Sequence, residues 1–255
     1  MNLTDVRAVI TGGVSGLGYG VARHLVAQGG KVVLLDINDE RGATAVSELG
    51  DAASYLRTDV TDEAGVASTV AQARDAMGGL NVAVSCAGVL GAGRVLGREG
   101  PMPLSQFETT VRINLVGSFN VAKAAADLMQ HNAPGEDEER GVIVNTASVA
   151  AYEGQIGQAA YSASKGGVVA MTLPMAREFA RIGVRVMTIA PGVFHTPMVD
   201  GMPEAVYQSL CAQVPYPSRL GTPEEFAHTV AFIVSTRYLN GSTIRLDGAI
   251  RMQAK

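Results

Sequence analysis

The sequence predicts an α/β protein with a doubly wound, seven-stranded parallel sheet that carries helices on both faces. Short apolar runs rich in β-branched residues recur along all 255 residues, and continuous apolar strands of this kind are typical of a buried parallel sheet. Helix-length segments separate the runs, which indicates successive βαβ units. No change in composition marks a second domain, so we expect residues 1–255 to form one domain.

Strands and helices alternate along the whole chain. The seven expected strands are 7–11, 31–36, 54–60, 81–88, 141–148, 184–192 and 243–248. The helical segments between them include 16–28, 61–77, 105–130, 160–181 and 223–235. Segments 91–103 and 131–140 interrupt the alternation with turn-forming or charged residues. We expect the second to be a solvated loop, whereas the first either is solvated or borders the ligand crevice, because it follows the carboxyl end of a strand.

The composition argues against several classes of protein. The chain is 47% hydrophobic and 17% charged, enough for one large core and unlike a disordered chain. Its 20 basic and 24 acidic residues leave a net charge of -4, so we expect no nucleic-acid partner. No apolar run reaches the ~18 residues of a membrane span, and the first residues carry no targeting pattern, so we expect no membrane contact and a cytoplasmic location. Cys86 and Cys211 lack CxxC spacing and are expected to be free thiols.

The segment TGGVSGLG, residues 11–18, predicts a phosphate-binding turn between the first strand and the first helix. Glycines at 12, 16 and 18 would allow a tight turn, close approach to a pyrophosphate and close helix packing. The spacing differs from G-x-G-x-x-G and is weak evidence alone. A P-loop would need Lys-Ser/Thr after the last glycine, where this chain has Tyr19 and Gly20.

The second expected strand ends in Asp36, eighteen residues after Gly18. A carboxylate there can accept both ribose hydroxyls of an adenosine, although a strand-end turn residue is the alternative. The same charge would repel the 2′-phosphate of NADP, and neither Ser15 nor Ile37 offers a cation. We therefore expect NAD as the coenzyme.

The segment YSASK places Tyr161 and Lys165 four residues apart, so on a helix both side chains share one face. Such a pair is common on solvated helices, but Ser148 lies thirteen residues upstream at an expected strand end. Oxidising an alcohol needs a base, and a nearby ammonium favours phenolate, so we expect Lys165 to lower the Tyr161 pKa. Ser148 would then orient the substrate oxygen. The histidines are scattered and no G-x-S-x-G motif occurs, which argues against a metal site and a serine hydrolase.

Together these motifs resemble the short-chain dehydrogenase/reductase family, over essentially the whole chain, and this resemblance implies a Rossmann fold. It implies that the catalytic residues are Asn114, Ser148, Tyr161 and Lys165, with Asn114 ordering a water that relays the proton to Lys165. Cys86 stands where the family has asparagine in an NAG turn. The coenzyme would contact Gly12, Ser15, Gly16, Leu17, Gly18, Asp36, Asp59, Val60, Cys86, Ala87, Gly88, Tyr161, Lys165, Pro191, Gly192, Val193 and Thr196.

Two longer segments, VAAYEGQIGQAAYSASK and LDGAIRMQ, are similar to the type-2 3-hydroxyacyl-CoA dehydrogenase subfamily, also called 17β-hydroxysteroid dehydrogenase type 10. This likeness implies NAD-dependent oxidation of short or methyl-branched 3-hydroxyacyl-CoA thioesters by a homotetramer. Candidate substrate contacts are Gln155, Gln158, Phe194 and Met198, and candidate contacts to the coenzyme A phosphates are Arg94 and Arg98.

Two alternatives remain open on the sequence alone. One is a 3-oxoacyl carrier-protein reductase or a hydroxysteroid dehydrogenase of the same fold. The other, from a different class, is an NAD-binding scaffold or interaction protein without turnover.

Overall fold

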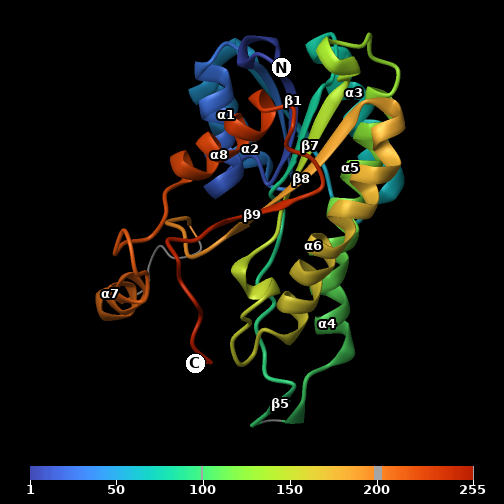
Figure 1. Cartoon of the computed structure of the whole chain (residues 1–255). Coiled ribbons are helices and arrows are strands. Elements are labelled where there is room, and N and C mark those ends of the chain that lie inside the picture. The colour runs from blue at the N-terminus through green and yellow to red at the C-terminus, as the bar shows by residue number, and fades with distance from the viewer. Residues whose placement is uncertain (99, 198–202, 255) are drawn as a thin grey trace.

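Seven parallel strands form one central sheet in the order β3-β2-β1-β4-β7-β8-β9 (Figure 1). The computed structural model describes residues 1–98, 100–197 and 203–254. The strands are β1 (Arg7–Thr11), β2 (Lys31–Asp36), β3 (Ala53–Arg57), β4 (Val82–Ser85), β7 (Gly141–Thr146), β8 (Val184–Pro191) and β9 (Thr243–Leu246). The predicted fold class is confirmed. The chain reverses its direction of winding between β1 and β4, and this switch point is where ligands of open α/β sheets bind.

Helices cover both faces of the sheet (Figure 1). On one face lie α1 (Gly16–Ala27), α2 (Asp39–Leu49) and α8 (Pro223–Ser235); on the other lie α3 (Glu63–Met77), α5 (Gly117–Met129) and α6 (Ala159–Phe179). Alternate strand residues point to opposite faces of the sheet and pack into two separate hydrophobic cores. Ile10 packs with the α1 and α8 side chains, whereas Val9 packs with those of α3 and α5. Burial on both faces explains why the strands are mostly apolar.

Shorter elements complete the chain. α4 (Leu104–Val111) packs beside α6, and α7 (Glu204–Ala212) lies apart from the sheet in Figure 1. The two-residue strands β5 (Leu96–Gly97) and β6 (Gly100–Pro101) form a hairpin within segment 91–103. Single turns of 3-10 helix occupy η1 (Leu3–Asp5), η2 (Gly50–Ala52), η4 (Glu136–Glu138), η5 (Val149–Ala151) and η6 (Ala180–Ile182).

The expected helix 105–130 is interrupted by a π-helical segment, η3 (Arg112–Val116), between α4 and α5. The wider turn contains Asn114, which is fully buried. Single π-helical turns inside α-helices occur frequently at functional sites. Amphipathic periodicity over so short a stretch does not reveal the extra residue per turn, so the sequence predicted one continuous helix.

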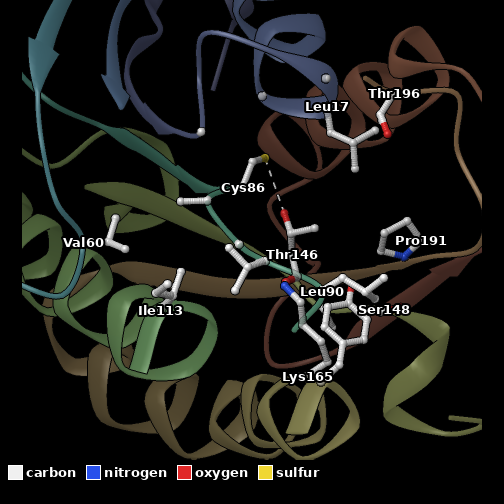
Figure 2. Close-up of a pocket in the computed structure, with 18 of the residues that line it drawn as sticks. Leu17, Val60, Cys86, Leu90, Ile113, Thr146, Ser148, Lys165, Pro191 and Thr196 are labelled. Carbon is white, nitrogen blue, oxygen red and sulfur yellow. Dashed lines mark hydrogen bonds between the residues drawn. The ribbon is translucent and has the colours of Figure 1, made fainter. Parts of the chain in front are cut away.

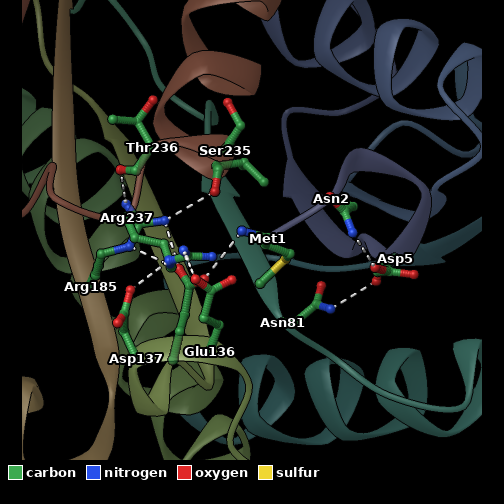
Figure 3. A network of polar contacts seen from close by, with 12 residues as sticks. Met1, Asn2, Asp5, Asn81, Glu136, Asp137, Arg185, Ser235, Thr236 and Arg237 are labelled. Carbon is green, nitrogen blue, oxygen red and sulfur yellow. Dashed lines mark hydrogen bonds and ion pairs between the residues drawn. The ribbon is translucent and has the colours of Figure 1, made fainter.

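Segment 131–140 was predicted to be a solvated loop, and this is wrong for its last residues. The Glu139 side chain is only 8% exposed and accepts two hydrogen bonds from Arg185 of β8, at 2.9 and 2.7 Å. Arg185 also donates to the carbonyl oxygens of Ile233 and Thr236 at the end of α8, and Figure 3 shows it beside Arg237 and the acidic segment. A buried guanidinium needs a counter-charge, and Glu139 supplies it.

Candidate active site

A cleft of about 730 Å³ lies along the carboxyl ends of the central strands, at the switch point between β1 and β4 (Figure 2). The glycine turn lines one side of it, the Cys86–Gly88 turn and α6 line the centre, and the loop after β8 lines the other side. Residues predicted from four separate stretches of sequence therefore border one cleft.

The glycine turn has backbone angles and close contacts that favour glycine. Gly12 and Gly16 have φ angles of +62° and +52°, which side chains other than glycine rarely adopt. A Cβ on Gly18 would lie 2.4 Å from the carbonyl oxygen of Gly12, so this position has no room for one. Because α1 begins at Gly16, its unpaired amide groups open toward the cleft and favour an anion there.

Asp36 is held in place at the end of β2. Its Oδ1 accepts hydrogen bonds from the backbone amides of Ile37 at 2.8 Å and Asn38 at 3.2 Å, and the residue lines the cleft. Arg57 pairs with Asp36 in the strand register, but its guanidinium binds Asp39 at 2.8 Å. The nearby cation is thus paired with Asp39, and the Asp36 side chain borders the cleft.

Asp59 and Val60, predicted to meet the adenine, both line the cleft. Asp59 Oδ1 accepts hydrogen bonds from the amide and the hydroxyl of Thr61, at 2.9 and 2.8 Å. The Val60 carbonyl oxygen accepts a hydrogen bond from Asn120 at 3.0 Å. Hydrogen bonds therefore hold both residues in the turn after β3.

The Cys86 side chain, just after β4, contacts the end of β7. Its sulfur lies 3.4 Å from Thr146 Oγ1, and burial raises the pKa of the thiol to about 11 (Figure 2). The thiol therefore stays protonated at neutral pH and contacts the neighbouring strand β7. Both cysteines are free, as predicted.

Tyr161, Lys165 and Ser148 converge in the centre of the cleft. Tyr161 and Lys165 project from the first turns of α6, and the Lys165 Nζ lies 5.8 Å from the centre of the Tyr161 ring. Lys165 is buried and donates a hydrogen bond to the Thr146 carbonyl oxygen at 2.7 Å. Ser148 follows β7 at the same edge and hydrogen-bonds the phenol.

Lys165 was predicted to lower the pKa of Tyr161, but the net effect of the surrounding protein groups is to raise it. Burial raises the pKa of Tyr161, and the hydrogen bond from Ser148 opposes this rise. Burial also lowers the pKa of Lys165, to about 8. The prediction considered the attraction between the two groups and left out the hydration that both lose in the cleft.

Asn114 lies behind the cleft wall. Its amide accepts a hydrogen bond from the Val89 amide at 2.8 Å and donates to the Val89 carbonyl at 2.9 Å and the Ser164 hydroxyl at 3.0 Å. These bonds tie the turn after β4 to the first turns of α6. The amide therefore holds the position of the turn, while the predicted water relay stays a prediction.

The loop after β8 faces the glycine turn. Pro191 at the end of β8 and Gly192, Val193 and Thr196 after it all line the cleft. The Thr196 side chain lies 3.5 Å from where a Cβ on Gly16 would be. The loop and the turn thus enclose the cleft from opposite sides.

The predicted substrate residues divide into three groups. Gln158 and Phe194 line the cleft, although Phe194 is only 7% exposed and packs edge-on against Phe226. Gln155 lies outside the set of described residues that line the cleft, and its amide donates to the Gln253 carbonyl at 3.2 Å. Met198 falls outside the described residues.

Arg94 and Arg98 are exposed near the β5–β6 hairpin, among the described residues that do not line the cleft. Instead, sequence reasoning missed Arg112 and Met252, which do line it. Arg112 could have been suspected from its place two residues before Asn114, whereas no local pattern marks Met252, which comes near the end of the chain.

No cluster of three potential metal ligands occurs in the part of the chain that the structure describes. Among the same residues no helix is both long and apolar enough to cross a membrane.

Comparison with known proteins identifies the family. Residues 7–206 match the short chain dehydrogenase family, and the chain belongs to it and is an oxidoreductase. Among its relatives are the 3-hydroxyacyl-CoA dehydrogenases type-2 of Bos taurus, 50% identical, and of Homo sapiens, 51% identical; each match spans 248 residues, 96% of this chain and 95% of the relative. The crystal structure of 3-hydroxyacyl-CoA dehydrogenase type-2 from Mycobacterium avium superimposes with a TM-score of 0.95 at 40% identity, over 99% of this chain and 98% of that one.

Proposed function

We propose that the protein oxidises short or methyl-branched 3-hydroxyacyl-CoA thioesters to 3-oxoacyl-CoA with NAD. The observation that carries this proposal is the convergence of Ser148, Tyr161 and Lys165 beside a phosphate-binding turn in one cleft. Relatives that share about half of the sequence are named 3-hydroxyacyl-CoA dehydrogenase type-2. The names of these relatives support a 3-hydroxyacyl-CoA substrate, whereas Ser148, Tyr161 and Lys165 support the oxidation of an alcohol.

The cleft fits a dinucleotide. Gly12 and Gly18 pack too closely for a side chain, so a pyrophosphate would meet only backbone there. The Asp36 carboxylate, held by the Ile37 amide, offers acceptors for ribose hydroxyls. When bound, NAD supplies a hydride acceptor and a positive ring. Asp36 would repel a 2′-phosphate, which favours NAD over NADP.

In the proposed mechanism, Ser148 hydrogen-bonds the substrate hydroxyl and holds it beside the Tyr161 oxygen. Tyr161 must first lose its own proton, which the positive charges of Lys165 and of bound NAD would favour, and its phenolate then takes the hydroxyl proton as the carbon loses its hydride. Lys165 has a pKa of about 8, so it can exchange a proton with its surroundings near neutral pH. Asn114 keeps the turn after β4 in place against α6.

The proposal is tested by following NADH absorbance with three oxidised substrates: acetoacetyl-CoA, a 3-oxoacyl carrier-protein thioester and a ketosteroid. Each is measured with NADH and with NADPH. Turnover with acetoacetyl-CoA and NADH is expected to be fastest. A faster rate with NADPH, or with either of the other substrates, would contradict the assignment, and binding of NADH without any turnover would favour the scaffold alternative.

Tyr161→Phe tests the role of the phenol. The variant removes only the hydroxyl, so we expect turnover to fall more than a hundredfold while the Kd for NADH stays within about threefold. Tyr238→Phe is the matched control, because that side chain is fully exposed and is not among the described residues that line the cleft. If Tyr161→Phe retains more than a tenth of the rate, Tyr161 is not the base.

We also propose that the protein assembles into a homotetramer. Exposed apolar side chains on the helices, including Phe119 on α5 and Phe232 on α8, are consistent with helices that pair across subunits. Size-exclusion chromatography with light scattering tests this, and a monomer mass would contradict it.

A further inference from the structure

The C-terminal segment, residues 249–254, turns after β9 and runs to the C-terminus (Figure 1, red end). Gly248 and Ala249 have φ angles of +56° and +66°, which reverse the chain direction after β9. The Ile250 side chain is then fully buried and anchors the segment. Two residues later, Met252 lines the same cleft as Tyr161 and Gln158.

Hydrogen bonds join this segment to residues 152–158, the stretch between Ser148 and Tyr161. The Ile156 amide donates to the Ala254 carbonyl oxygen at 3.0 Å, and the Gln155 side chain donates to the Gln253 carbonyl oxygen at 3.2 Å. The polar groups of Gln155 are thus used to hold the C-terminal segment. This explains why a residue predicted to contact substrate lies outside the cleft lining.

Arg245, on β9, connects the C-terminal segment to residues 152–158. Its guanidinium makes a two-pronged ion pair with Glu153, at 2.8 and 2.9 Å, and binds Asp247 at 2.8 Å. It also donates to the Ile250 carbonyl oxygen at 3.3 Å and lies 5.1 Å from the Tyr152 ring centre. Such bidentate arginine contacts fix geometry as well as supply energy.

Arg251 adds a second contact to the same acidic pair. Its guanidinium lies 3.2 Å from Asp247 and 3.5 Å from Glu153. The carboxylates of Glu153 and Asp247 therefore each bind two cations, one on β9 and one on the C-terminal segment. Removing Arg251 alone would leave the Arg245 pairing in place.

We propose that Met252 determines acyl-chain specificity and that Arg245 is the positioning residue that holds Met252 in the cleft wall. This inference rests on the proposed function. A thioether on an unbranched side chain adapts to irregular apolar surfaces, which suits a wall against acyl chains of differing length. The ion pairs of Arg245 place this wall relative to the segment that connects Ser148 to Tyr161.

The test compares kcat/KM for 3-hydroxybutanoyl-CoA and 3-hydroxyoctanoyl-CoA in the full chain. Met252→Ala enlarges the acyl space, so the octanoyl-to-butanoyl ratio is expected to rise about tenfold, a size typical of added methylenes in an apolar pocket. Met252→Phe is expected to lower the same ratio. The Kd for NADH should stay within about twofold of wild type in both, because Met252 is proposed to meet the acyl group.

Gln253→Ala is the matched control. Its side chain is exposed, and its contact to Gln155 uses the backbone carbonyl, so the ratio should not change. Arg245→Lys keeps the charge but loses the two-pronged geometry, and we expect KM for both thioesters to rise about fivefold at unchanged NADH affinity. Glu153→Gln should reproduce this rise if the ion pair positions the wall, and melting curves establish that each variant is folded.

The outcomes separate the two proposals. If wild type turns over the thioesters and both Met252 variants keep its ratio, the specificity role of Met252 is refuted while the proposed function stands. If Arg245→Lys and Glu153→Gln leave KM unchanged, the positioning role is refuted. If wild type turns over neither thioester with NAD, the proposed function fails, and the acyl role of Met252 fails with it.

Discussion

Replacing Lys165 with methionine should stabilise the protein while abolishing its activity. The folded protein lowers the pKa of Lys165 from the ordinary 10.5 to about 8 because burial disfavours the ammonium. At about 1.4 kcal/mol per pKa unit, holding the charge in the cleft costs about 3 kcal/mol. Methionine fills a similar volume without a charge.

Part of this gain is lost with the hydrogen bond from Lys165 to the Thr146 carbonyl oxygen. An acceptor left unpaired in a buried site costs about 1–2 kcal/mol. The net expectation for Lys165→Met at pH 7 is therefore a free energy of unfolding about 1–2 kcal/mol higher than that of wild type. Stability given up at an active site is a common trade for function.

The pH dependence gives a sharper check. Since the folded pKa lies below the unfolded one, the penalty in wild type is nearly complete below pH 8 and disappears as the pH rises toward 10.5. The advantage of the variant should therefore be about 2 kcal/mol smaller at pH 9.5 than at pH 7. Tyr161, whose pKa is raised, weakens both proteins above pH 10 and cancels in the comparison.

Urea unfolding followed by far-ultraviolet circular dichroism measures this difference, because the chain has no tryptophan. Lys31→Met is the control: that side chain is exposed at the start of β2, and the change should stay within about 0.5 kcal/mol. A Lys165→Met variant less stable than wild type at pH 7, or a difference that does not change with pH, would refute the reasoning.

Three further changes test the cleft and the core. Gly18→Ala places a Cβ 2.4 Å from the Gly12 carbonyl oxygen, so the turn must shift. We expect the Kd for NADH, measured by fluorescence titration of the folded variant, to rise at least about tenfold. An unchanged Kd would mean that the turn does not bind the coenzyme. Asp36→Asn removes a charge from the ribose end, so the Kd for NADH should rise about tenfold while that for NADPH falls, and a parallel change in both would contradict the NAD assignment. Glu139→Gln leaves Arg185 without its buried counter-charge, so the free energy of unfolding, measured in urea, should fall by about 3 kcal/mol while kcat stays unchanged. A loss below about 1 kcal/mol would mean that water or other groups replace the ion pair.

Local patterns in the sequence were sufficient to predict the sheet. A strand buried on both faces is mostly apolar, and β1, β2, β4, β7 and β8 all contain such apolar runs. The predicted strand ends were less accurate: β3 stops at Arg57 and β7 at Thr146, earlier than predicted, because the following residues leave the sheet to border the cleft.

Part of the site was also readable from spacing. Glycines that allow positive φ values stand next to a helix start, and Tyr161 and Lys165 share one helix face because four residues make about one turn. The order of strands then brings these segments to one edge of the sheet. Their placement around one cleft agrees with the prediction, while the role of each residue awaits the variants above.

The sequence by itself determined the class of fold, the glycine turn and the pairing of tyrosine with lysine, since periodicity and spacing are local properties of the chain. Only the tertiary structure decided the burial that lowers the Lys165 pKa, the counter-charge that Glu139 gives to Arg185, and the arrival of Met252 in the cleft. These depend on contacts between residues far apart in the chain. Desolvation and packing of this kind arise when the elements assemble, and no short stretch of sequence specifies them.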